Sequence, residues 1–102
     1  MDERTAIKKM PESHKRDIQT AVEILKEQGC AEIYLFGSLV NGDFTEKSDI
    51  DLAVKGLMKN KFFKTLGKLI MELDHRVDLI NLEKTDRFST MLKKKGVLLR
   101  VA

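Results

Sequence analysis

Three aspartates are spaced so that they could share divalent cations. Asp49 and Asp51 lie two residues apart in the alternating segment 49–54, so a strand would direct both carboxylates to one face. Asp78 interrupts a second apolar segment, 76–80, although Asp is disfavoured in strands. Carboxylate oxygens suit Mg²⁺, whose shell is usually completed by water and substrate phosphates. The pattern predicts a two-metal site for phosphoryl or nucleotidyl transfer, and its alternative is a solvated strand edge.

A glycine-serine pair directly after another apolar segment could bind phosphate. Gly37 and Ser38 follow residues 31–36, and Gly42 comes four residues after Ser38. Glycine lets the backbone turn tightly and approach a ligand, and the following amides and the serine hydroxyl can donate hydrogen bonds to phosphate oxygens. Taken alone, such a pair is more often a plain turn. It is not a Walker A loop, because no Gly-Lys-Ser/Thr sequence follows.

Helical and strand patterns alternate along the chain. Ile18, Val22 and Leu25 predict an amphipathic helix over 11–28, which Gly29 would end. A short helical or looped stretch is expected between Ser38 and Gly42. The other predicted elements are strands over 31–36, 49–54, 76–80 and 97–101, a helix over about 60–74, and a last helix from Thr85 or Asp86 to Lys95.

This element order predicts an α/β (α+β) domain with a small mixed sheet of three or four strands and helices packed on one face. The other face would stay open around the three aspartates. A chain of 102 residues folds around a single core, so we assign residues 11–102 to one domain and residues 1–10 to a flexible N-terminal segment. The residues expected to face the helices are Ile33, Leu35, Ile50, Leu52, Val77 and Leu79.

The composition is that of a globular protein, with 42% hydrophobic and 34% charged residues and a net charge of +3. Such a mild charge does not require a nucleic-acid partner. Cys30 is the single cysteine, so a reducing, cytoplasmic location is expected; His14 and His75 are the only histidines that could assist a catalytic thiol, which we do not expect. No signal peptide or membrane span is predicted, since the N-terminus is charged and no apolar run approaches ~20 residues.

Taken together, the two motifs are far more specific than either alone. The string runs Gly37-Ser38, then Gly42, then Ser48-Asp49-Ile50-Asp51. It resembles the signature of the polymerase-beta-like nucleotidyltransferase superfamily. At this length the chain is most similar to the minimal nucleotidyltransferases (MNT), the antitoxins of HEPN/MNT toxin–antitoxin pairs. The similarity covers about residue 15 to the end, with specific motifs only at 37–51 and 76–80.

The resemblance implies a fold, a reaction and a set of site residues. The fold would be the polymerase-beta-like nucleotidyltransferase fold, and the reaction would transfer AMP from ATP to a tyrosine of a HEPN toxin. A hydroxyl would attack the α-phosphate in line and release pyrophosphate. The nucleotide-binding residues would be Gly37, Ser38, Gly42 and Ser48, and the catalytic residues, which also bind two Mg²⁺, would be Asp49, Asp51 and Asp78.

The chain departs from the family pattern at one place. Members often carry an arginine before the second glycine, where this chain has Asn41. Lys47, Lys55 and Arg76 are candidates for the missing phosphate contact, although lysines as common as these are usually solvated. Tyr34, the only tyrosine, is expected to pack or line the site rather than accept AMP.

Two other functions remain open at this point. The chain could neutralise a toxin by occlusion without catalysis, or it could transfer nucleotide to a small molecule or an RNA end. In every case a chain this short holds little that could recognise an acceptor, so we expect a partner protein and a homo- or hetero-oligomer. The apolar residues that could contact it are the tail 97–101, Phe44, Met58 and Met91.

Overall fold

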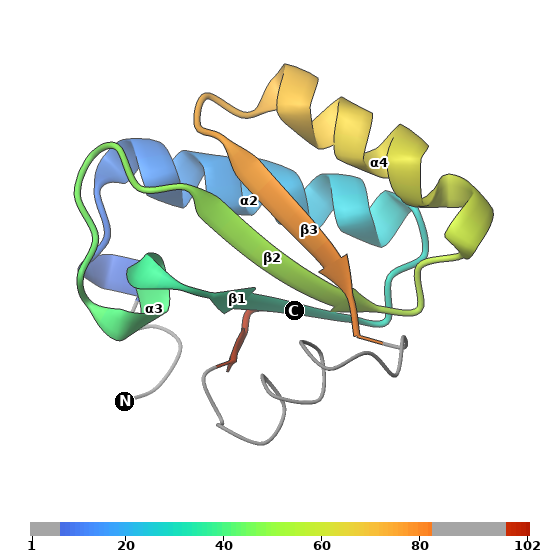
Figure 1. Ribbon diagram of the computed structural model, residues 1–102, viewed down its shortest axis with the longest axis horizontal. Helices are drawn as coiled ribbons and strands as arrows, with labels where there is room; N and C mark the ends of the chain where they lie inside the picture. Colours follow the sequence, from blue (N-terminus) through green and yellow to red (C-terminus); the bar gives the residue numbers. More distant parts are fainter. Residues whose placement is uncertain (1–6, 83–97) are drawn as a thin grey trace.

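A four-stranded sheet forms the centre of the computed structural model, which describes residues 7–82 and 98–102 (Figure 1). Its strand order is β3-β2-β1-β4. β2 pairs antiparallel with β1 and parallel with β3, and β4 pairs antiparallel with β1. The predicted small mixed sheet is therefore confirmed. The strands are β1 (Glu32–Phe36), β2 (Ile50–Lys55), β3 (Val77–Asn81) and β4 (Leu99–Arg100).

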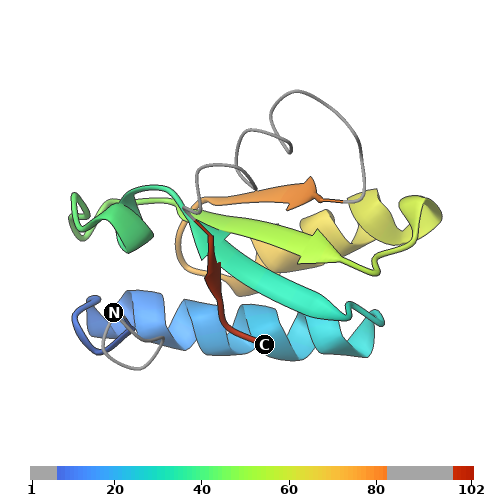
Figure 2. The same ribbon diagram turned by 90° about the horizontal axis from the view of Figure 1, so that it is seen from below.

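The helices are α2 (Glu12–Glu27), α3 (Ser38–Asn41) and α4 (Lys59–Glu72), close to the predicted ranges. α2 begins after Pro11, whose φ of −58° suits a helix start, and it ends before Gly29, whose φ of +90° an L side chain rarely adopts. Figure 2 shows α2 and α4 on the same side of the sheet. Among the described residues, no helix has the length and apolar character to cross a bilayer. The helix predicted to end at Lys95 lies outside the described residues.

The face of the sheet toward the helices holds the main core, as the alternation predicted. Leu25 of α2 and Leu69 of α4 are fully buried against it. Burying a leucine side chain stabilises a fold by roughly 1.5–3 kcal/mol, so this layer fixes the sheet on its helices. Of the six residues predicted to face the helices, Val77 is half-buried. The other five are buried, namely Ile33, Leu35, Ile50, Leu52 and Leu79.

The opposite face is not open along its whole length, which corrects the prediction. Ala53 is fully buried there, in a second apolar cluster with Phe36 and Leu82. Tyr34 is the register partner of Ala53 and packs against the same cluster. The reason is that the outward positions of β1 carry aromatic side chains, large enough to cover the small residue on the neighbouring strand. The packing role expected of Tyr34 is confirmed.

The start of the chain differs from the predicted flexible segment 1–10. Residues 1–6 lie outside the described part, but Met10 is only 3% exposed and Ile7 packs against the main core. The two apolar side chains are three residues apart, and the Met10 N–H donates to the Ile7 carbonyl at 3.0 Å. Residues 7–10 therefore pack with the domain that was predicted to begin at residue 11.

Candidate active site

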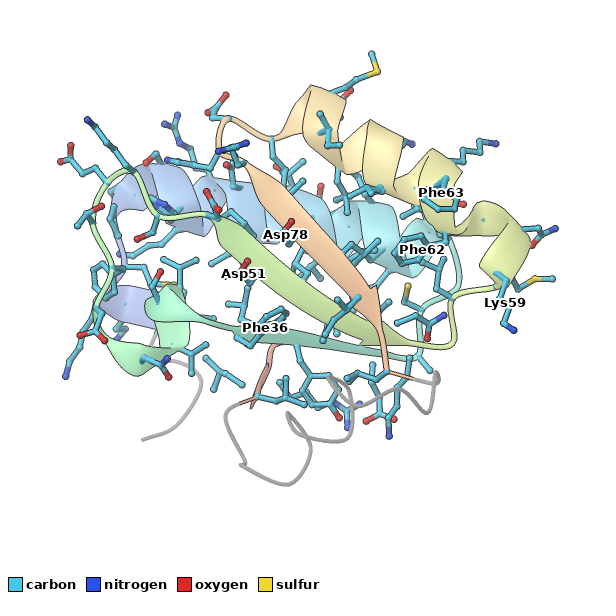
Figure 3. The ribbon with its side chains drawn as sticks, in the orientation of Figure 1. Phe36, Asp51, Lys59, Phe62, Phe63 and Asp78 are labelled. Atoms are coloured by element: carbon cyan, nitrogen blue, oxygen red, sulfur yellow. The ribbon has the colours of Figure 1, made fainter. Side chains whose placement is uncertain are left out.

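Two aspartates meet at the beginnings of adjacent parallel strands. Asp51 is the second residue of β2, Asp78 is the second residue of β3, and the two are register partners. Neighbouring strands lie about 4.8 Å apart, so their side chains leave the same face side by side (Figure 3). The two carboxyl groups interact electrostatically, so that each disfavours the charge on the other. Asp49 precedes β2 by one residue, and its charge also acts on Asp51.

The environment of Asp51 favours its protonated form. The pKa of Asp51 is raised to about 6, first by burial, then by the negative charges of Asp78 and Asp49, and finally by a hydrogen bond that protonated Asp51 donates to Asp78. Phe36, the register partner of Asp51 on β1, is 9% exposed and lies on the same face. Phe36 was not among the site residues predicted from the sequence. The alternation of side chains in 31–36 could have indicated it, because it places Phe36 on the other face of the strand from Ile33 and Leu35.

Gly37 brings the glycine-serine turn against the same carboxylate. Its φ of +78° and ψ of −153° lie in a region that is essentially limited to glycine. A Cβ at this position would overlap Asp51 Oδ2, so the backbone passes directly over the carboxylate. Ser38 then begins α3, and the Gly37 carbonyl accepts hydrogen bonds from the N–H groups of Val40 and Asn41, at 3.1 and 3.0 Å. The fold therefore unites the glycine-serine pair with Asp51.

The other two predicted nucleotide-binding residues make local contacts. Gly42 ends α3 in the left-handed conformation, and its N–H donates to the Ser38 carbonyl at 3.1 Å. A Cβ on Gly42 would meet nothing within 4 Å. Ser48 Oγ accepts from the Thr45 N–H at 2.8 Å, which closes the turn before Asp49. Both residues shape the loop between the two motifs.

A cavity of about 400 Å³ opens beside the aspartates. Asp49, Arg76 and Asp78 line it together with Ile70 and Val77. Arg76 is the one of the three predicted phosphate contacts that lines this cavity. Lys55 instead lies at the other end of β2 and pairs with Glu32 at 4.0 Å, and Lys47 is exposed in the loop.

The donor set fits a hard divalent cation. All three acidic groups offer carboxylate oxygens, and the pKa of Asp51 is raised first by burial and then by the neighbouring negative charges, which a bound cation would neutralise. Within the described residues, no group of three metal-binding side chains is already gathered around one point. Phosphate oxygens and water would therefore have to complete a shell that Asp49, Asp51 and Asp78 begin.

A buried polar cluster lies behind the aspartates, on the first turns of α2. His14 is fully buried, and Asp17 is 4% exposed. The ring of His14 stacks on that of His75, with centroids 3.7 Å apart. Burial would raise the pKa of Asp17, but hydrogen bonds from Asp74 and His75 hold it below its ordinary value. This cluster was not predicted from the sequence. The helical spacing of His14 and Asp17 could have indicated it, because it places both residues on the apolar face of the helix with Ile18.

The comparisons with known proteins decide the family. The model for Polymerase beta, Nucleotidyltransferase matches residues 19–100. The chain belongs to this family. The resemblance inferred from the glycine-serine pair and the Asp-x-Asp motif is thereby confirmed.

Individual relatives share part of the chain or its fold. Over 45 residues it is 36% identical to MJ1547 of Methanocaldococcus jannaschii, provisionally named a protein adenylyltransferase; the match covers 44% of this chain and 37% of that protein, little more than a third of the relative's length. A chain of a toxin–antitoxin complex with AMP-PNP is 25% identical, with a TM-score of 0.64 over 88% of this chain and 72% of that one. A chain of a variant MntA–HepT toxin–antitoxin complex is 27% identical, with a TM-score of 0.65 over 83% and 71%.

The first prediction concerns the titration of Asp51. In the metal-free protein its carboxyl ¹³C resonance should titrate near pH 6, well above the ordinary value of 3.8. Asp78→Asn should lower the midpoint because it removes a neighbouring negative charge. Asp43→Asn, in the exposed loop, should leave it unchanged. A wild-type midpoint at the ordinary aspartate value would contradict the raised pKa of Asp51.

The same shift gives the protein a pH-dependent stability. Between pH 4 and 6 the folded state keeps a proton on Asp51 that the unfolded state has released. The contribution of Asp51 to the free energy of unfolding should therefore fall as the pH rises through this window and stay low above it. Urea unfolding should show Asp51→Asn gaining stability over wild type as the pH rises from 4.5 to 7.5. An equal difference at both values would count against this account.

The second prediction separates the two constraints on Gly37. Gly37→Ala meets both a disfavoured φ and the overlap with Asp51, whereas Gly29→Ala meets a disfavoured φ with nothing within 4 Å of the new Cβ. Gly29→Ala should cost about 1–2 kcal/mol of stability. Gly37→Ala should cost more, and it should also move the Asp51 ¹³C midpoint. Denaturation and NMR titration check both, and an unchanged midpoint in Gly37→Ala would refute the close approach.

Proposed function

We propose that this chain is a Mg²⁺-dependent protein adenylyltransferase that transfers AMP from ATP to a hydroxyl of a partner protein. We further propose that the partner is a HEPN toxin, that the acceptor is one of its tyrosines, and that the chain is the antitoxin. The carrying observation is the Asp51–Asp78 pair beside the turn at Gly37. Nucleotidyl transfer needs metal-binding carboxylates and phosphate-binding backbone within reach of one triphosphate. The family supports the reaction class.

In this proposal the three aspartates hold two Mg²⁺ and the glycine-serine turn holds the triphosphate. Bound Mg²⁺ would lower the pKa of the attacking hydroxyl and neutralise charge on the leaving pyrophosphate. Asp78, the exposed member of the pair, faces the acceptor and helps to activate its hydroxyl. The hydroxyl oxygen forms a bond to the α-phosphorus as the bond to pyrophosphate breaks. Phe36 keeps water from one side of Asp51, which strengthens the electrostatic interactions there.

Arg76 takes the phosphate contact that Asn41 cannot supply. Arg76 lines the same cavity as Asp49 and Asp78, whereas Asn41 is exposed at the end of α3. A guanidinium beside carboxylates suits a substrate that carries several phosphates together with bound cations. We therefore propose that Arg76 replaces the family's usual arginine in function.

The proposed acceptor class comes from the relatives. One is provisionally named a protein adenylyltransferase, and two solved chains belong to toxin–antitoxin complexes, one of them with AMP-PNP. A small domain with an open cavity beside its carboxylates leaves room for a protein-borne hydroxyl. Since the reaction consumes ATP, we place the pair in the cytoplasm.

The third prediction tests the chemistry directly. The double variant Asp49→Asn with Asp51→Asn should reduce transfer of label from α-³²P-ATP to the co-purified partner by roughly 100-fold or more, because metal and triphosphate lose their main ligands. Mass spectrometry should find the AMP adduct on a partner tyrosine with the wild-type protein and not with the double variant. Asp43→Asn, a matched substitution in the exposed loop, should label at the wild-type rate.

Three results would overturn the proposal in different ways. Undiminished labelling by the double variant would remove the aspartates from the reaction. An unlabelled partner that the double variant still neutralises in cells would make the chain an antitoxin that acts by occlusion. Adduct formation on an antibiotic or an RNA end, without protein labelling, would change the acceptor class and keep the chemistry.

A further inference from the structure

We propose that His14, Asp17 and His75 are positioning residues that clamp together the two chain segments leading into the aspartates. The clamp ties residue 48, before Asp49, and residues 74–75, before β3, to the first turns of α2. Its effect on catalysis rests on the proposed function, whereas its effect on the geometry of the strand starts does not.

The first arm of the clamp is His14. Its Nε2 lies 2.8 Å from the Ser48 carbonyl oxygen, which can only accept, so Nε2 carries the proton and donates. Ser48 immediately precedes Asp49, and its own hydroxyl is already engaged by the Thr45 N–H. The backbone that enters β2 is therefore held from both sides. His14 reaches this point from a fully buried position, where its orientation is fixed by packing.

The second arm is Asp17, one turn along the same helix. Asp17 Oδ1 accepts from the Asp74 N–H at 3.1 Å, and Oδ2 accepts from the His75 N–H at 2.9 Å and from His75 Nδ1 at 2.7 Å. Three hydrogen bonds on one carboxylate fix the turn between α4 and β3. That turn sets where β3 begins, and with it the place of Asp78.

The two arms are joined to each other and to the sheet. The rings of His14 and His75 stack at 3.7 Å with an interplanar angle of 25°, and Ser13 Oγ lies 3.4 Å from His75 Nε2. On the sheet side, the Ile50 N–H donates to the Arg76 carbonyl at 2.8 Å, directly between the two clamped segments. The Asp51–Asp78 register therefore lies in a closed ring of contacts that runs through α2.

Packing alone does not account for a histidine at this place. With Nε2 donating to Ser48, Nδ1 of His14 is buried without a hydrogen-bond partner among the described residues. A leucine would fill similar space without leaving a polar atom unsatisfied. A leucine would lose both the hydrogen bond to Ser48 and the ring stacked on His75, so these two interactions are what histidine adds.

The fourth prediction compares two variants of His14, each of which keeps one interaction of this side chain and removes the other. His14→Phe keeps a ring on His75 and removes the donor to Ser48, whereas His14→Gln keeps a donor near the Nε2 position and removes the ring. Thr65→Val is the control, because it removes a buried hydrogen bond, from Thr65 Oγ1 to the Lys61 carbonyl at 2.7 Å, outside the clamp.

Amide hydrogen exchange in the metal-free protein measures the effect of the clamp on the start of β2, and it does not depend on catalysis. The ratio of exchange at Ile50 to exchange at Ala31 isolates the site end of β2, since Ala31 bonds the Lys55 carbonyl at the other end. We expect His14→Phe to raise this ratio about tenfold, His14→Gln to leave it within about threefold, and Thr65→Val to leave it unchanged. Asp17→Asn, which keeps one acceptor oxygen, should also raise the ratio if His14→Phe does not fold.

The kinetics of AMP transfer measure the effect of the clamp on catalysis. His14→Phe and Asp17→Asn should lower kcat about tenfold or more with little change in KM for the partner, because the carboxylates are displaced while the partner's contacts remain. His14→Gln should recover most of kcat. A wild type that transfers no AMP contradicts the proposed function, and the exchange ratio then decides the clamp by itself. An unchanged ratio in both His14→Phe and Asp17→Asn overturns the clamp whatever the kinetics.

Discussion

The pairing of β2 with β3 is the interaction on which the site depends, because it sets two carboxylates side by side at one end of the sheet. Asp51 and Asp78 are register partners on parallel strands, and Asp51 is half-buried beside Phe36. Left to themselves, two such charges would separate or draw in water. Opposing this, the apolar pair Leu52 and Leu79 lies one residue further along the same strands, buried against the helices. The register that buries these leucines also forces the aspartates together.

The alternation of side chains explains why the site occupies one end of one face. Along β2, every second residue points into the helical layer, and the residues between them point the other way. On that second face Ala53 is covered by an apolar cluster, whereas Asp51 lies at its edge, beside Phe36 and beneath Gly37. Asp51 therefore has an apolar surface on one side and an open cavity beyond Asp78 on the other. An acidic group in such a place favours a proton or a cation over a free charge.

Much of this could be predicted from the sequence because it depends on local spacing. The two-residue interval between Asp49 and Asp51, and the glycine-serine pair after an apolar run, are visible without knowledge of the fold. Phe36 became a site residue through the antiparallel register of β1 and β2, which the sequence does not state. His14 and Asp17 depend on which turn of α2 faces the loops before β2 and β3, a matter of helix rotation and tertiary packing. The burial of Ala53 escaped prediction for the same reason, since the side chains that cover it come from other strands.

Three unfavourable features lie together at one end of the sheet, away from the centre of the core. These features adjoin the starts of β2 and β3, and they are crowded carboxylates, a glycine in a backbone conformation that other residues rarely adopt, and a buried histidine nitrogen that no other described residue pairs with. Each opposes folding, and none touches Leu25 or Leu69 in the centre of the helical layer. A ligand that carries cations and phosphates would relieve the first of these directly, by neutralising the aspartates. Binding and stability are then linked, because whatever binds the folded state alone stabilises it.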